Sequence, residues 1–159
     1  KVFLFAVISV AVILCAMWFN NKLDEKAAEQ IVAQEKTAQQ ADIKALATIK
    51  IQDLVVGGGV VAKKGDAVSV NYLGQFLDDK KFDSSYDRNQ PFEFTLGAGQ
   101  VIRGWDLGIV GMKVGGKRTL VVPADLAYGA NGYGPIPGST TLKFSVDLLD
   151  VNGSTSTPK

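Results

Sequence analysis

Aromatic residues and one carboxylate beside predicted turns are the residues of this sequence that best fit a binding site. Phe82 is followed at once by Asp83, and Tyr128 precedes the Gly- and Pro-rich stretch of residues 132–138. Proteins hold small apolar ligands in concave, largely aromatic pockets that carry a few polar groups. The sequence therefore predicts an apolar binding pocket, although Phe92 and Phe144, taken singly, fit a place in the hydrophobic core equally well.

The composition narrows the chemistry available to such a pocket. The 159 residues include no histidine, the side chain most often used as a general base and metal ligand. Cys15 is the only cysteine, so a disulfide within the chain is excluded. The formal net charge is +1, which gives no strong field for nucleic acid. We therefore expect a site without metal or cofactor, in a protein that does not bind nucleic acid.

Strand patterns follow one another from Ile49 onward and would form the walls of the pocket. Apolar residues alternate with polar ones at positions 68, 70 and 72, at 92, 94 and 96, and at 142–148. Residues 117–122 form a further strand pattern that ends at Pro123. Such alternation is typical of antiparallel sheets with one face in water.

One short helix is expected among these strands, beginning near Gly104. Trp105, Ile109 and Met112 are spaced to share one face of a helix. Gly111 is a natural place for that helix to end. The predicted fold is therefore α+β, a curled antiparallel β-sheet, or half-barrel, wrapped around one short α-helix.

The first third of the sequence has a different character. Residues 2–19 are apolar except for Ser9, close to the shortest run that spans a bilayer core of roughly 30 Å. We expect residues 1–20 to form a transmembrane anchor, with a cleaved signal sequence as the alternative. Residues 21–48 are rich in helix-forming Ala, Gln, Glu and Lys and predict a polar helical stalk, with a coiled coil as the alternative. Residues 152–159 predict a disordered tail.

Four stretches make the prediction more specific. They are KFDSSYDRN at residues 81–89, VIRGW at 101–105, AYGA at 127–130, and the strand pattern of 141–151. Over about residues 49–151 the sequence resembles the FKBP-type peptidyl-prolyl cis-trans isomerases, the macrolide-binding immunophilins. The resemblance implies an isomerase domain over these residues that accelerates rotation about Xaa-Pro bonds and assists protein folding.

The resemblance also implies which residues form the site. The implied catalytic residues are Asp83, Tyr128, Trp105, Ile102 and Phe82, with Trp105 as the pocket floor and Ile102 offering its backbone N–H. The implied substrate-binding residues are Tyr72, Phe92, Val101, Tyr133, Ile136 and Phe144. Rotation about a peptide bond breaks no covalent bond, so the chemistry suits a sequence without histidine.

The family resemblance and the apolar run at residues 2–19 together predict the partners and the location. We expect proline-containing polypeptides as substrates, macrolides as inhibitors, and a membrane as partner through the N-terminal helix. The isomerase domain is expected on the extracytoplasmic side of that membrane, with export after signal cleavage as the alternative. Two other functions stay open: a module that binds proline-containing peptides without turnover, and a membrane-tethered interaction scaffold.

Overall fold

The computed structural model describes residues 26–154 and divides the chain into two compact units, residues 1–42 and 43–159. A helix occupies residues 26–46, within the range of the predicted stalk. The composition of this segment explains why it is helical, because Ala, Gln, Glu and Lys side chains lose little rotamer freedom in a helix. Within residues 26–154, no helix combines the length and the apolar character needed to cross a bilayer. The predicted anchor at residues 1–20 lies outside the described residues.

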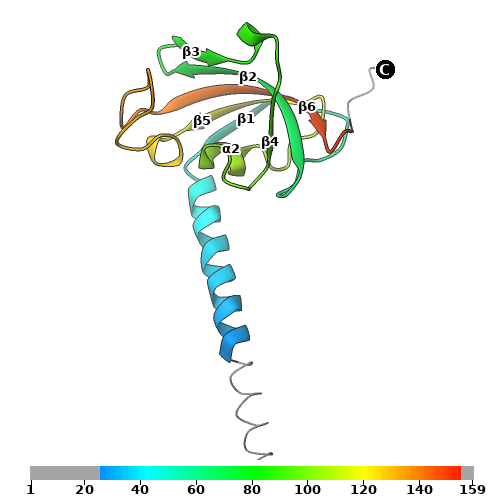
Figure 1. The fold of residues 1–159 in the computed structure, drawn as a ribbon, viewed down its shortest axis with the longest axis vertical. Helices are drawn as coiled ribbons and strands as arrows, with labels where there is room; N and C mark the ends of the chain where they lie inside the picture. Colours follow the sequence, from blue (N-terminus) through cyan, green and yellow to red (C-terminus); the bar gives the residue numbers. More distant parts are fainter. Residues whose placement is uncertain (1–25, 155–159) are drawn as a thin grey trace, which may run out of the picture. The chain divides into compact units, whose positions relative to one another are not determined.

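The second unit contains one antiparallel sheet, which Figure 1 shows curling around a short helix. In chain order the strands are β1 (Lys50–Val55), β2 (Ala67–Phe76), β3 (Lys81–Ser84), β4 (Phe92–Thr95), β5 (Lys117–Val122) and β6 (Leu142–Val151). The helices are η1 (Tyr86–Arg88), α2 (Arg103–Gly108) and η2 (Ala124–Leu126). The sheet order is β1-β5-β6-β2-β3, and β4 also pairs with β2. The predicted curled antiparallel sheet with one helix is confirmed.

The two long central strands bury the residues that the alternation predicted. In β6, Leu142, Phe144, Val146 and Leu148 all face the core, while the residues between them are partly exposed. β2 shows the same alternation, so its inner face and that of β6 form a continuous apolar surface. Burying an aliphatic or aromatic side chain of this size contributes roughly 1.5–3 kcal/mol.

The helix α2 packs directly on β5 because two of its residues are glycines. A Cβ atom added to Gly104 would lie 2.3 Å from Cγ1 of Val122, and one added to Gly108 would lie 2.9 Å from Cδ2 of Leu120. Real Cβ atoms do not approach so closely, so a larger residue at either position would force the helix or the facing side chain to move. The close contact fixes the helix, and with it Trp105, over the sheet.

The helix ends earlier than the sequence predicts. α2 stops at Gly108 rather than near Gly111, although the predicted face of Trp105, Ile109 and Met112 is buried as expected. At this end Arg118 of β5 takes the place of further helical hydrogen bonds, because its guanidinium donates to the carbonyl oxygens of Gly108 at 2.7 Å and Val110 at 3.2 Å. A side chain distant in sequence therefore satisfies the carbonyls of the last helical turn.

The turn that follows β6 is more ordered than predicted. Asn152, which the sequence placed in a disordered tail, accepts a hydrogen bond from the backbone N–H of Ala67 at 2.9 Å and donates one to Asp66 at 2.9 Å. These bonds hold the turn after β6 against the start of β2. Residues 155–159 lie outside the described part of the chain.

Candidate active site

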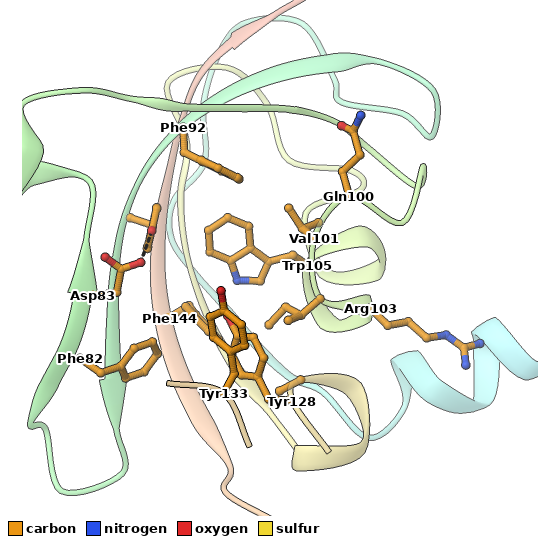
Figure 2. A pocket seen from close by; sticks show the side chains of 13 residues that line it. Phe82, Asp83, Phe92, Gln100, Val101, Arg103, Trp105, Tyr128, Tyr133 and Phe144 are labelled. Carbon is orange, nitrogen blue, oxygen red and sulfur yellow. Dashed lines mark hydrogen bonds between the residues drawn. The ribbon is translucent and has the colours of Figure 1, made fainter. Parts of the chain in front are cut away.

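A cavity of about 540 Å³ opens between α2, the strands β2 to β4, and the loop after η2. Figure 2 shows Trp105 at its centre, with Phe92, Asp83, Phe82, Phe144, Tyr128 and Tyr133 arranged around the indole. The lining is Tyr72, Phe82, Asp83, Phe92, Gln100, Val101, Ile102, Arg103, Trp105, Ala127, Tyr128, Tyr133 and Phe144. Most of these side chains are apolar, and aromatic rings predominate, as in pockets for small apolar groups.

Trp105 forms the floor of the cavity and is held there by the edges of other rings. The centroid of its ring lies 5.0 Å from that of Tyr72, 5.3 Å from that of Phe144 and 6.3 Å from that of Phe92. All three pairs are edge-to-face, an arrangement worth about 0.5–1.5 kcal/mol per pair beyond the area buried. Because three strands supply these rings, the floor is rigid before any ligand arrives.

Asp83 is the carboxylate of the cavity, and its oxygens are held by neighbouring donors. The hydroxyl of Tyr72 donates to one oxygen, and Nη1 of Arg88 donates to the other at 2.6 Å. The backbone N–H of Ser84 donates to that second oxygen at 2.8 Å. Burial alone would raise the pKa of Asp83, but the bonds from Tyr72 and Arg88 outweigh it and lower that pKa below its usual value. Asp83 is therefore ionised at neutral pH.

The donors to Asp83 are also linked to each other. Nη2 of Arg88 donates to the hydroxyl oxygen of Tyr72 at 2.8 Å, and its guanidinium carbon lies 5.7 Å from the centre of the Tyr72 ring. Three residues from β2, β3 and η1 thus form one network beside the cavity. The network fixes the orientation of the carboxylate, which faces the indole from the wall formed by β3 (Figure 2).

Tyr128 supplies a hydroxyl on another side of the cavity. Burial, above all, raises the pKa of this hydroxyl, and the nearby Asp83 and Tyr133 add to the effect. The hydroxyl therefore stays protonated and able to donate a hydrogen bond. Its ring is stacked on that of Tyr133, with centroids 5.3 Å apart and an angle of 14° between the planes.

The loop that carries Tyr133 is closed on itself. The backbone groups of Tyr133 and Ile136 exchange two hydrogen bonds of 2.9 Å, and Ile136 is buried in the core. Gly132 has a φ of +70°, and a Cβ atom there would lie 2.2 Å from the carbonyl oxygen of Ile136. The tight turn presents the Tyr133 ring, which is 70% exposed, at the mouth of the cavity.

The residues before α2 form the remaining wall. The carboxylate of Asp106 accepts hydrogen bonds from the backbone N–H groups of Gly97 at 2.8 Å and Gly99 at 2.9 Å, which fixes the loop leading to Val101. Ile102 begins the helix, and none of the hydrogen bonds within residues 26–154 uses its N–H. That N–H is available to a ligand.

A model of the family described as FKBP-type peptidyl-prolyl cis-trans isomerase matches residues 58–149, more than half of the chain. The chain belongs to this family. The predicted FKBP-type isomerase domain is thereby confirmed, and the relatives that follow support peptidyl-prolyl cis-trans isomerase activity.

Two curated relatives and one solved structure illustrate how similar this chain is to known FKBP-type proteins. FK506-binding protein 2 of Debaryomyces hansenii is 53% identical over 95 residues, which cover 60% of this chain and 70% of the relative. The FK506-binding protein of Neisseria meningitidis serogroup B is 53% identical over 102 residues, covering 64% of this chain and 94% of the relative. The crystal structure of AtFKBP13 matches with a TM-score of 0.62 and 40% identity, covering 65% of this chain and 93% of that one. Among the curated relatives, the match covers between 22% and 98% of the relative's own length.

The FKBP-type cavity contains every predicted site residue except Ile136. Ile136 is 5% exposed and packs in the hydrophobic core, where it anchors the loop that carries Tyr133. It is not among the residues that line the cavity.

Three lining residues were missed by the sequence reasoning, namely Gln100, Arg103 and Ala127. Gln100 directly precedes the VIRGW stretch, Arg103 lies within it, and Ala127 begins AYGA. Their position next to recognised residues was the available signal, but the search favoured aromatic and acidic side chains. Figure 2 shows the Arg103 side chain pointing away from Trp105, so its contribution to the lining is chiefly its backbone and stem.

Proposed function

We propose that the FKBP-type domain accelerates rotation about Xaa-Pro bonds by taking the prolyl group into the cavity above Trp105. The observation that carries the mechanism is the combination of an aromatic floor with a fixed carboxylate and a protonated tyrosine hydroxyl. Nothing in this lining is arranged as a nucleophile with a base. Such a site can bind and distort an amide without breaking a bond.

The size of the task is set by amide resonance. The barrier to rotation is about 18–20 kcal/mol, and an uncatalysed Xaa-Pro bond takes tens of seconds or longer to isomerise. Reaching the millisecond range requires roughly a 10⁴-fold acceleration, or about 5–6 kcal/mol off the barrier. A binding site achieves this only if it holds the twisted amide more tightly than the planar forms.

The cavity favours the twisted amide in two ways. Water stabilises the charge-separated resonance form that stiffens the C–N bond, and an aromatic cavity excludes that water. The twisted amide is less polar, so it loses less on leaving solvent. The Ile102 N–H and the Tyr128 hydroxyl supply donors for the carbonyl oxygens beside the proline, which keep the chain oriented while the amide turns.

Macrolides are proposed as inhibitors of the same cavity. The printed names of the curated relatives describe FK506 binding, and those proteins share about half of their residues with this chain over the matched region. An apolar cavity with donors at its rim suits a macrolide for the same reasons that it suits a prolyl peptide.

For the whole chain we propose a membrane-tethered isomerase that assists folding of proline-containing proteins. In this arrangement residues 1–20 are the anchor, residues 21–48 the stalk, residues 49–151 the isomerase domain and the last residues a tail. The support is the apolar run at residues 2–19, followed by a polar helix-forming segment. The domain would then work on the extracytoplasmic side, or be exported after cleavage of the run as a signal.

The test is the cis-trans exchange of a short Xaa-Pro peptide, measured with the full chain and with three variants. Trp105→Leu, Tyr128→Phe and Asp83→Ala each remove one part of the proposed site. We expect strong acceleration by the unaltered chain, a sharp loss in Asp83→Ala and smaller losses in the other two. Saturable peptide binding without acceleration, by a folded protein, would instead indicate a module that binds proline without turnover.

A further inference from the structure

A second groove lies beside the prolyl cavity and is nearly as large, with a volume of about 480 Å³. It lies over the paired ends of β4, β2 and β6. Its polar lining comprises Ser69, Glu93, Thr95, Gln100, Asp150 and Asn152. No lysine or arginine contributes to that lining. The functions argued so far make no use of this groove.

Gln100 joins the groove to the prolyl cavity, because its side chain lines both. Its carbonyl oxygen accepts a hydrogen bond from the backbone N–H of Thr95 at 2.7 Å, which fixes the amide at the border between the two hollows. Figure 2 shows Gln100 beyond Val101, on the side of the cavity where Phe92 also lies. A third hollow shares Phe92 with the prolyl cavity and Glu93 with the groove. The strand β4 and Gln100 thus lie at the border between neighbouring hollows.

A polypeptide with its proline over Trp105 has to continue out of the cavity on both sides. An extended chain advances about 3.3 Å per residue, and because Gln100 lines both hollows, a chain that leaves the cavity past Gln100 meets the groove next. The substrates of an isomerase that acts on folding chains are long, and only a short part of each fits the prolyl cavity.

The sheet register places two carboxylates in one row across this groove, on the face of the sheet opposite to Phe92 and Phe94, so a substrate leaving the cavity reaches them over the edge strand β4. Glu93 of β4 is paired with Ser69 of β2, and Ser69 is paired with Asp150 of β6. Side chains directly opposite in such pairs lie about 4.5–5.5 Å apart at Cβ. The backbone N–H of Gly153 donates to Asp150 at 2.6 Å, which fixes that carboxylate. Glu93 is exposed and forms no ion pair with another residue of 26–154.

We propose that this groove is an extended substrate subsite that accepts a lysine or arginine side chain a few residues from the proline. The proposal rests on the proposed function, since the cavity must hold the proline for the groove to be reached. Glu93 supplies the accessible negative charge. Asp150 adds to the negative potential from β6, on the other side of Ser69. The hydroxyls and amides of the lining form hydrogen bonds with the substrate backbone.

The competing explanation is that Glu93 is simply a charge on a short edge strand. Edge strands commonly carry charged residues that prevent pairing with other chains. In that case the substrate would not respond to the residue, and a test with peptides of different charge separates the two explanations.

The experiment compares peptides that share one Xaa-Pro core and carry a single Lys, Leu or Glu two to five residues before or after the proline. Exchange rates and dissociation constants are measured with the full chain, with Glu93→Gln and with Glu35→Gln. The last variant makes the same charge change on the helix of residues 26–46, where Glu35 is exposed.

For at least one placement of the lysine, we expect the Lys peptide to be bound and turned over about two- to fivefold better than the Glu peptide, as for an exposed ion pair. The advantage should disappear in Glu93→Gln, persist in Glu35→Gln and shrink as salt is raised. Equal results for all placements, or an advantage that survives in Glu93→Gln, would overturn the proposal.

The unextended core peptide keeps this test separate from the proposed function. If the core peptide is turned over equally by all three proteins, the isomerase proposal stands whatever the groove does. If no protein turns over the core peptide, the isomerase proposal fails, and the dissociation constants still decide whether the groove selects lysine.

Discussion

At the residue scale, Asp83 shows how a carboxylate can be both fixed and kept charged beside an apolar cavity. Tyr72, Arg88 and the Ser84 N–H all donate to it, and the bonds from Tyr72 and Arg88 keep its pKa below the usual value. We therefore expect Asp83 to act through its charge and its position rather than as a general acid. This distinguishes the site from hydrolytic centres, in which a carboxyl group has to exchange a proton during the reaction.

The lowered pKa of Asp83 makes its contribution to stability depend on pH. A carboxyl whose folded-state pKa lies below its usual value of 3.8 stabilises the fold above that value, and the stabilisation is lost as pH falls through the folded-state pKa. We expect Asp83→Asn to lower the free energy of unfolding at pH 7 by about 1 kcal/mol, since Asp83 is partly exposed and solvent screens its pairing. At pH 2.5 the difference should be much smaller.

Urea unfolding at both pH values checks this expectation. Asp87→Asn is the matched control, because Asp87 forms only an exposed ion pair with Lys81. The control should change the unfolding free energy little at either pH. A difference for Asp83→Asn that is as large at pH 2.5 as at pH 7 would mean that charge is not the source of its contribution.

The stacked tyrosines allow a second prediction about single atoms. The Tyr128 hydroxyl is half-buried beside Asp83, whereas Tyr133 is 70% exposed. We expect Tyr128→Phe to lower kcat/KM for an Xaa-Pro peptide by about three- to tenfold, the value of one hydrogen bond of roughly 0.5–1.5 kcal/mol. Tyr133→Phe removes the same atom from the exposed ring and should leave kcat/KM within about twofold. Equal losses in both variants would count against a hydrogen bond from Tyr128 in the transition state.

At the element scale, side-chain hydrogen bonds fix both ends of α2, one from a residue of the helix itself and one from β5. Asp106 binds the glycine loop before the helix, and Arg118 binds the carbonyls at its end. Arg118 is itself held by Asp53 of β1, at 2.6 and 3.0 Å from the two carboxylate oxygens. A helix of so few residues is not stable alone, so these contacts and its packing on β5 hold Trp105 in place.

The packing of α2 on β5 predicts the effect of adding one methyl group. Gly104→Ala would place Cβ 2.3 Å from Val122, so the helix would have to move away from the sheet. We expect a loss of about 1–3 kcal/mol in the free energy of unfolding, typical of an overpacked core, together with reduced turnover because Trp105 moves with the helix. Urea unfolding and peptide exchange measure the two effects.

Gly58→Ala serves as the control for this substitution. A Cβ atom at Gly58 meets no heavy atom within 4 Å, and its backbone does not require glycine. The control should change stability by less than about 0.5 kcal/mol, as surface substitutions usually do. If Gly104→Ala behaves like Gly58→Ala, the close approach of α2 and β5 is not needed for the fold.

The sequence predicted the elements whose pattern repeats along the chain and missed single polar side chains that bond to the backbone of a neighbouring element. The strand β6 was predicted because its alternation repeats over several residues, and the FKBP-type resemblance identified most of the cavity. The early end of α2 was not predictable, since it depends on Arg118 reaching back across the fold to Gly108. Gln100 was missed although its contact with Thr95 is local, because the search favoured aromatic and acidic side chains.

Ile136 shows the limit of transferring roles from a resemblance. The loop position was close to the cavity in sequence, yet its side chain packs in the core and only its backbone supports Tyr133. Which side of a tight turn a residue faces is decided by the turn itself, here by two glycines of positive φ on either side of Tyr133. Composition marks such a turn but does not fix its direction.

At the scale of the whole molecule, the cavity and the N-terminal part can be separated experimentally. Every residue that lines the prolyl cavity belongs to the unit of residues 43–159. We therefore expect removal of residues 1–42 to leave kcat/KM for a short Xaa-Pro peptide within about twofold. A large loss of turnover on removing residues 1–42 would show that the first unit contributes to the isomerase itself.

The proposed anchor gives a second expectation at this scale. The full chain should sediment with lipid vesicles, and a chain lacking residues 1–20 should stay in the supernatant. A full chain that remains in the supernatant would rule out the anchor.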